Sequence, residues 1–202
     1  MKTGNYVKSE KGVNIPYLEQ TDLRVGLNSG EDMIFPDAEP PYKDSIPQRN
    51  LTYKLERKRI VPQVKDGDVI LDVGCGDWPH VSSHYKTVGV DRYRKNLIEA
   101  KEMFPEVDYV WGSAEHLPFK SNTFEGLVCV HMFVAPKPID KIVTEMLRVG
   151  KPESVVVVKE SKEKIQSIYD ICKNEGLDTA HYNESVNNDD PYLFIRKDKT
   201  SI

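Results

Sequence analysis

Five apolar runs that follow one another from residue 69 onward constrain the fold of this chain more than any other feature of its sequence. They are rich in β-branched residues and lack an alternation of apolar and polar side chains, a pattern typical of strands buried on both faces. Because loops and helix-like stretches separate the runs, their order predicts repeated β-α-β units and a parallel sheet covered by helices. The runs span residues 69–73, 87–91, 108–112, 126–132 and 154–160.

Two connecting segments have the spacing of an amphipathic helix, and both helices are predicted to pack on the sheet. The first has an apolar stripe of Ile139, Ile142, Val143, Met146 and Leu147, and its opposite side carries Lys141, Glu145 and Arg148. The second has a stripe of Ile165, Ile168, Tyr169 and Cys172. It ends before Gly176, a residue type that readily adopts the left-handed conformation closing many helices.

The C-terminal part predicts two further strands, over residues 177–182 and 192–197, joined by a polar turn. We therefore expect a Rossmann-like, doubly wound α/β fold with a mostly parallel seven-stranded sheet and an antiparallel C-terminal strand. Residues 1–48 contain prolines and glycines without a sustained period, which predicts a loop-rich N-terminal arm or cap. Residues 49–202, which begin with a predicted helix, are expected to form a single domain.

The charge balance argues against a polyanionic partner such as nucleic acid, because 28 basic residues face 32 acidic ones. The basic cluster at residues 53–59 contains Glu56, and we interpret it as a solvated helix face. Three widely spaced cysteines indicate reduced thiols rather than a disulfide framework. With no signal-like N-terminus and no apolar run of membrane length, we expect a cytoplasmic protein without a membrane partner.

A glycine-containing turn follows the first predicted strand, in the sequence LDVGCGDW. Gly74 and Gly76 permit positive φ angles and a close approach of a ligand to main-chain N–H groups. A dinucleotide site requires G-x-G-x-x-G/A, but Pro79 occupies the third of these positions. This argues against a NAD-dependent oxidoreductase, although Asp91, nineteen residues after Asp72, would also suit a NAD ribose.

Four segments, in order along the chain, resemble the motifs of the class I S-adenosylmethionine-dependent methyltransferases. DVGCG resembles motif I, written D/E-x-G-x-G-x-G, and VGVDRY places an acid after the second strand. Residues 112–133 are similar to the family's passage from the third to the fourth strand, and LRVGKPES is similar to its turn before the fifth. The resemblance, strongest to the small-molecule type (methyltransferase domain 11), implies the cofactor S-adenosyl-L-methionine and the product S-adenosyl-L-homocysteine.

The resemblance also implies which residues bind the cofactor. Asp91 matches the acid that holds both ribose hydroxyls, and residues 113–115 match positions that line the adenine. The candidates for cofactor binding are Asp72, Gly74, Cys75, Gly76, Asp91, Arg92, Ser113, Ala114, Glu115 and His131. His131, predicted at the carboxyl edge of the sheet, is also a candidate general base, with a cofactor or backbone contact as the alternative.

Some features depart from the family pattern or lie outside it. Trp78 stands at the third glycine position of motif I, so it either covers the methionine end of the cofactor or packs locally. His80 and His84 could share one helical face, but without further ligands nearby no metal site is expected. EPPY, at residues 39–42, resembles a motif of amino methyltransferases but falls outside the family order, and we interpret it as a turn.

A sulfonium methyl group is already a strong electrophile, so such a protein mainly needs to hold the acceptor in line and exclude water. We expect methyl transfer by in-line displacement to a small-molecule acceptor, with the arm of residues 1–48 as a cover for it or as a tail or dimer contact. A non-catalytic S-adenosylmethionine-binding partner or regulatory subunit is the alternative, because GKPES lacks the two glycines of the family's turn. A homodimer is left open.

Overall fold

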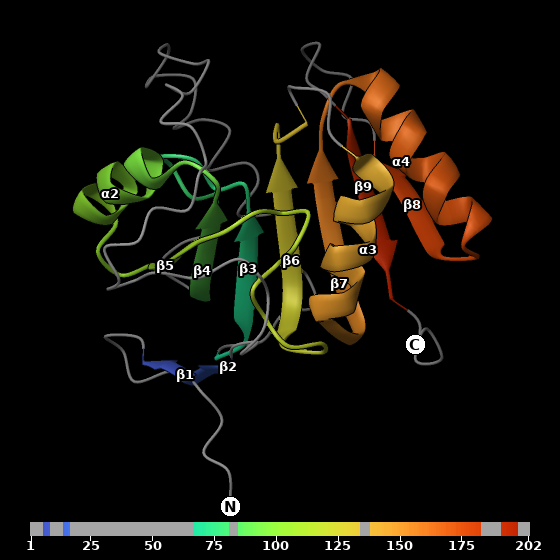
Figure 1. Cartoon of the computed structure of the whole chain (residues 1–202). Helices are drawn as coiled ribbons and strands as arrows, with labels where there is room; N and C mark the ends of the chain where they lie inside the picture. The colour runs from blue at the N-terminus through green and yellow to red at the C-terminus, as the bar shows by residue number, and fades with distance from the viewer. Residues whose placement is uncertain are drawn as a thin grey trace, which may run out of the picture.

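A seven-stranded sheet forms the centre of the molecule in a computed structural model that describes residues 6–8, 14–16, 67–80, 85–133, 138–182 and 191–197. The strands lie side by side in the order β5-β4-β3-β6-β7-β9-β8 (Figure 1). Their bounds are β3 Val69–Val73, β4 Lys86–Asp91, β5 Asp108–Trp111, β6 Phe124–Val130, β7 Gly150–Lys159, β8 Asp178–Tyr182 and β9 Tyr192–Arg196.

The sheet is parallel except at β9, which runs antiparallel to both of its neighbours, β7 and β8. The order reverses direction at β3, whose two neighbours are β4 and β6. In open α/β sheets such a reversal leaves a crevice at the carboxyl ends of the strands, where ligands bind. The predicted mostly parallel seven-stranded sheet with an antiparallel C-terminal strand is confirmed.

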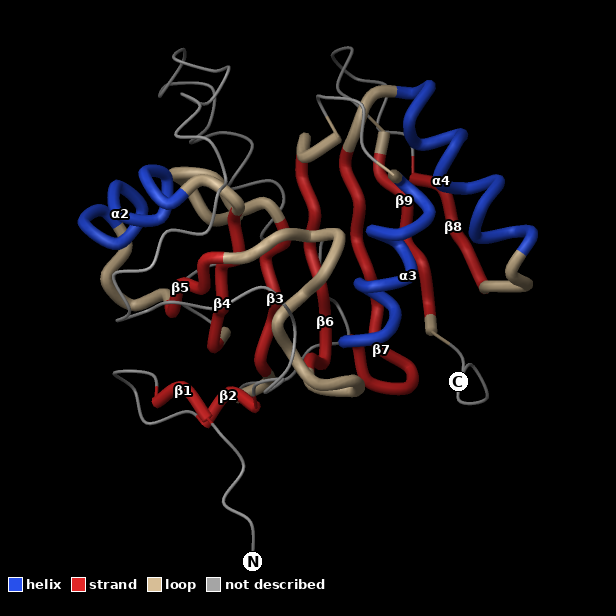
Figure 2. Tube along the Cα trace, in the orientation of Figure 1, coloured by secondary structure: helices blue, strands red, loops and turns tan. Residues whose placement is uncertain are grey.

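The described helices lie on both faces of the sheet, as the doubly wound prediction requires, and Figure 2 shows α3 (Ile139–Val149) and α4 (Lys162–Asn174) on the near face. These two helices bury apolar residues in one core cluster with Val110 of β5. The helix α2 (Arg94–Met103) lies on the other face, because Tyr109, which alternates with Val110, donates its hydroxyl to the carbonyl of Ala100 at 3.2 Å.

The two predicted helical stripes are confirmed as core-facing. Ile142, Val143 and Met146 of α3 are buried, as are Ile165, Ile168 and Cys172 of α4. Gly176 follows α4 with a φ of 71°, and the N–H groups of Gly176 and Leu177 donate back to the carbonyls of Lys173 and Cys172. This pair of bonds closes the helix in the Schellman arrangement that the glycine predicted.

Two parts of the backbone differ from the sequence predictions. The strands β1 (Tyr6–Lys8) and β2 (Asn14–Pro16) form an antiparallel pair within the segment predicted as loop-rich. Both are three residues long, too short to give a period. The segment GKPES, interpreted as a turn before the fifth strand, is part of β7, with a register shift opposite Phe124 and Gly126. Glu153 takes a φ of 67° there.

Several predicted segments lie outside the described residues. These are the rest of the N-terminal arm, the helix expected after residue 48, the basic cluster at 53–59, the EPPY turn and the polar turn before β9. No helix in the described part of the chain combines the length and the apolar character needed to cross a bilayer.

Candidate functional site

The glycine turn leaves β3 and folds back onto the end of β4. Gly74 and Gly76 have φ angles of 72° and 60°, a region that glycine enters without a steric penalty. The N–H groups of Gly74 and Cys75 both donate to the carbonyl of Val90, at 2.8 and 3.1 Å. A Cβ atom on Gly76 would have no described atom within 4 Å, so open space lies beside this glycine.

Asp91, the last residue of β4, ties the turn to the neighbouring strand. One oxygen of its carboxylate accepts the N–H of Gly76 at 3.0 Å, and the other accepts the N–H of Tyr93 at 2.7 Å. The residue is 7% exposed. These two main-chain donors orient the carboxylate at the end of β4.

The segment after β5 joins the same edge. Gly112 donates its N–H to the carbonyl of Asp91 at 3.1 Å, which brings Ser113, Ala114 and Glu115 next to the end of β4. The hydroxyl of Ser113 accepts the N–H of Glu115 at 3.2 Å. The predicted ribose acid and the predicted adenine-lining residues are therefore neighbours in the structure.

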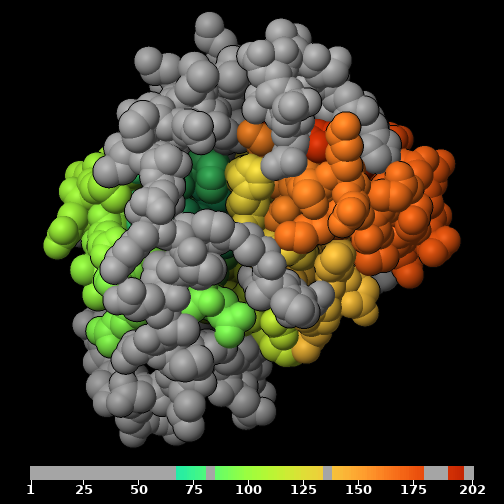
Figure 3. Space-filling model, turned by 90° about the horizontal axis from the view of Figure 1, so that it is seen from above, coloured from blue at the N-terminus to red at the C-terminus, as the bar shows by residue number. Residues whose placement is uncertain are grey.

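The end of β6 completes this edge, which Figure 3 views from above, with the β3 and β6 regions side by side. His131 is exposed and takes a φ of 49°, while its N–H donates to the carbonyl of Lys159 at 2.9 Å. Positive φ values in residues other than glycine often mark functional sites. Met132 lies over Gly74, since a Cβ atom on that glycine would stand 2.6 Å from the Cγ atom of Met132.

Asp72 is fully buried and holds the turn from within. Its Oδ2 atom accepts the N–H of His80 and lies 3.5 Å from the Nδ1 atom of that histidine. Its Oδ1 atom has no hydrogen-bond partner among the described residues. A buried carboxylate oxygen of this kind is costly unless a donor reaches it, which makes Asp72 a candidate contact for a bound group.

Cys75 directs its side chain into the molecule and not toward the open space. The thiol is buried beside Gly89, where an added Cβ atom would stand 2.8 Å from the sulfur. Burial, together with the negative charges of Asp72 and Asp91, raises the pKa of the Cys75 thiol well above its ordinary value. The side chain therefore remains a protonated packing group, and only the main chain of Cys75 faces the turn. All three cysteines are free and buried.

Two aromatic contacts place further candidates. Trp78 packs edge-to-face on Phe104, with ring centroids 4.7 Å apart, so the local-packing alternative describes its ring. The guanidinium of Arg92 lies 5.5 Å from the centre of the Tyr93 ring, and the carbonyl of Arg92 accepts the indole N–H of Trp111. Arg92 thus stands beside Asp91 with its main chain fixed by β5.

Sequence patterns missed three residues that contact the glycine turn or the segment after β5. The contact of Met132 with Gly74 could not be predicted, because the two residues lie far apart in the chain. Glu145 and Arg148 were placed opposite the apolar stripe of α3, yet both are half-buried and contact the segment after β5. The segment LRVGKPES, which is similar to a family motif, contains Arg148 and was the sequence signal for this residue.

The described residues contain no group of three or more side chains suited to a metal ion. His84, one of the two histidines considered for such a site, lies outside the described residues, and His80 turns toward Asp72.

Comparison with known proteins gives a matching family model and similar proteins of known name. Residues 71–158 match a family model described as a methyltransferase domain. A demethylmenaquinone methyltransferase of Bacillus cereus is 31% identical over 129 residues, 57% of this chain and 54% of that protein. A phosphoethanolamine N-methyltransferase 2 of Haemonchus contortus, solved with S-adenosyl-L-methionine, is 17% identical with a TM-score of 0.57, covering 75% of this chain and 52% of that one.

A TehB-like S-adenosylmethionine-dependent methyltransferase of Corynebacterium glutamicum has the same fold, with a TM-score of 0.60, 17% identity and coverage of 78% of this chain and 90% of that one. This chain spans about half the length of the first curated relatives that it matches. The matched region runs from within β3 to within β7 and so includes Asp72, the glycine turn, Asp91 and the end of β6. Residues 71–158 therefore match a methyltransferase domain, on a fold shared with solved S-adenosylmethionine-dependent methyltransferases.

Proposed function

We propose that this chain transfers the methyl group of S-adenosylmethionine to a small-molecule acceptor by in-line displacement. The observation that carries the proposal is the hydrogen bond from Gly76 to Asp91, which joins the glycine turn to the acid after β4. Open space beside Gly76 lies at the edge of the sheet where ligands of this fold class bind. The names of two similar proteins, a demethylmenaquinone and a phosphoethanolamine methyltransferase, support a small acceptor.

The residues at this edge fit an adenosyl ligand. The carboxylate of Asp91, which Gly76 and Tyr93 hold at the end of β4, would accept the ribose hydroxyls. Residues 113–115 would line the adenine, and the unpaired Oδ1 atom of Asp72 offers an acceptor at the turn. When bound, the cofactor supplies a methyl group on a positively charged sulfur.

The chain's own contribution would be orientation and the exclusion of water. His131 stands exposed at the carboxyl end of β6 with its backbone fixed by the carbonyl of Lys159. We assign His131 the task of accepting a proton from acceptors that must lose one, because a histidine near neutral pH can serve as a general base. An acceptor that is already deprotonated, such as a carboxylate, has no proton to lose and needs no such step.

Ligand binding is the first test. The purified protein is examined by mass spectrometry for retained ligand, and its melting temperature is measured with S-adenosylmethionine, S-adenosylhomocysteine or NAD. We expect the first two to raise the melting temperature and NAD to leave it unchanged. No shift with the first two, in folded and ligand-free protein, would contradict the proposal.

Turnover is the second test, because binding alone would also fit a non-catalytic partner or regulatory subunit. Formation of S-adenosylhomocysteine is followed with sets of quinols, phenols, amines and carboxylic acids as acceptors. We expect at least one set to support release of product. Tight binding of S-adenosylmethionine without product in any set would favour the non-catalytic alternative.

A further inference from the structure

The connection between β5 and β6, residues 112–123, contains no helix although all of it is described. Its side chains Leu117 and Phe119 are fully buried and join the core cluster that includes α3. A loop thus covers this part of the sheet where a doubly wound fold commonly has a helix. A loop lacks the internal ladder of hydrogen bonds of a helix, so its position depends on contacts from its neighbours.

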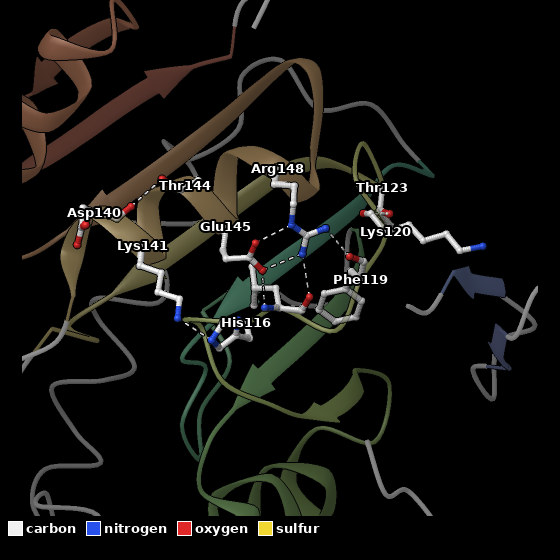
Figure 4. Close-up of polar contacts among 10 residues, drawn as sticks. His116, Phe119, Lys120, Thr123, Asp140, Lys141, Thr144, Glu145 and Arg148 are labelled. Atoms are coloured by element: carbon white, nitrogen blue, oxygen red, sulfur yellow. Dashed lines mark hydrogen bonds and ion pairs between the residues drawn. The ribbon is translucent and has the colours of Figure 1, made fainter. Parts of the chain in front are cut away.

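Two side chains of α3, Arg148 and Glu145, hold this loop by its main chain (Figure 4). The guanidinium of Arg148 donates to the carbonyls of Phe119 and Leu117, at 2.8 and 2.9 Å. The carboxylate of Glu145 accepts the N–H of Leu117 at 2.7 Å. Arg148 also donates to both oxygens of Glu145, at 2.6 and 2.8 Å, so the pair is locked in one arrangement.

The span of residues 113–116 contains the three adenine-lining candidates, residues 113–115, and is held at both of its ends. At one end, Gly112 is bonded to the carbonyl of Asp91 at 3.1 Å. At the other end, Leu117 is held through both its N–H and its carbonyl by Glu145 and Arg148. Because both ends are fixed, the span has few positions available, and its local turn orients it further.

We propose that the Glu145–Arg148 pair positions the adenine-lining span and thereby sets the affinity for the nucleoside part of the cofactor. The inference rests on the proposed function, which assigns residues 113–115 to the adenine. Both side chains act through the loop, so they are positioning residues. Their side chains are 27% and 17% exposed, for Arg148 and Glu145 respectively, and charge-assisted hydrogen bonds in such surroundings are stronger than at an open surface.

Arginine suits this role better than lysine. The two carbonyls and the carboxylate are reached by separate N–H groups of one rigid plane, whereas an ammonium group is a single point charge on a flexible chain. Arg148→Lys therefore keeps the positive charge but loses the planar arrangement of N–H donors. Arg148→Met removes both, and Glu145→Gln keeps an acceptor for the N–H of Leu117.

The test measures the dissociation constants of S-adenosylhomocysteine and 5′-methylthioadenosine, which shares the nucleoside but lacks the amino-acid end, by calorimetry. In Arg148→Lys and Arg148→Met, both constants should rise by the same factor, about tenfold or more, as expected for losing charged hydrogen bonds. With an acceptor in hand, the KM for S-adenosylmethionine should rise while kcat at saturation stays unchanged. Glu145→Gln should have the smallest effect of the three.

The matched control is Lys151→Met, which removes the ion pair of Lys151 with Glu125, a contact between β7 and β6. It should leave both dissociation constants unchanged. If the wild type binds neither ligand, the proposed function fails. If the wild type binds and both Arg148 variants bind equally well, or lose only S-adenosylhomocysteine, this inference fails alone.

Discussion

The carboxylate of Asp91 and the main-chain N–H of Gly76 are joined by a hydrogen bond of 3.0 Å, although the residues belong to different β-α units. The second carboxylate oxygen is occupied by Tyr93, at the start of the connection to α2. One side chain thus fixes the glycine turn, the end of β4 and the entry to α2 together. Any group that binds at this carboxylate also contacts the part of the molecule that shapes the turn.

Asp91→Asn should abolish most of the ligand affinity and cost little stability. An amide keeps the size of the carboxylate, but its NH₂ group faces one of two main-chain donors, Gly76 or Tyr93. We expect the dissociation constant of S-adenosylhomocysteine to rise by about tenfold or more and the free energy of unfolding to fall by about 1 kcal/mol. Glu102→Gln, an exposed acid on α2, is the control. Wild-type affinity in folded Asp91→Asn would show that the ribose acid is assigned wrongly.

The two glycines of the turn should respond differently to alanine. In Gly74→Ala the new Cβ atom would stand 2.6 Å from Met132 in a backbone with a φ of 72°. Left-handed strain and overpacking together should lower the free energy of unfolding by about 2–4 kcal/mol, measured with urea. Adding Met132→Ala should recover part of that loss. An unchanged stability of Gly74→Ala would mean that Met132 does not lie over the turn.

Gly76→Ala should instead act on binding. Its Cβ atom would meet no described atom within 4 Å, so only the left-handed backbone is strained, at about 1–2 kcal/mol. The methyl group would occupy the space that we assign to the cofactor. We therefore expect S-adenosylmethionine to raise the melting temperature of Gly76→Ala less than that of the wild type. The difference should exceed what the small loss of stability accounts for. A full shift would place the cofactor elsewhere.

The sheet could be predicted from the sequence because its strands are buried on both faces and so read as uninterrupted apolar runs. The stripes of α3 and α4 followed from helical period in the same way. Period alone could not find the role of Arg148, because any charged residue opposite an apolar stripe looks solvent-facing. Its partners are carbonyls of a loop, and main-chain groups leave no trace in a sequence pattern.

The site was predictable only where residue type limits the backbone or the chemistry. Gly74 and Gly76 take the positive φ angles that their positions suggested, and Asp91 stands at the end of β4. The partners of side chains that meet by packing could not be predicted, as with Met132 over the turn or Trp78 on Phe104. Such contacts depend on the path of segments distant in sequence.

Glu153→Gly should stabilise the protein. Glu153 is exposed and takes a φ of 67° inside β7, while its N–H is bonded to the carbonyl of Lys197 at 2.8 Å. Glycine adopts this backbone without the strain of about 1–2 kcal/mol that other residues carry, although it gains freedom in the unfolded chain. We expect a net gain of about 0.5–1 kcal/mol, seen as a melting temperature higher by roughly 1–4 °C. The melting temperature of Glu153→Asn should lie between those of the wild type and Glu153→Gly. A melting temperature of Glu153→Gly below that of the wild type would refute the left-handed backbone at this residue.

Cys172 should make the protein less stable at alkaline pH. Burial raises the pKa of its thiol from 9.0 to about 11, so between these values the folded chain keeps a proton that the unfolded chain has lost. The stability contributed by this thiol is complete below pH 9 and is lost as the pH rises through 11. Urea unfolding of the wild type and of Cys172→Ala at pH 8 to 11 measures it, because groups present in both proteins cancel in the difference. The wild type should lose stability more steeply, and two parallel curves would contradict the shift.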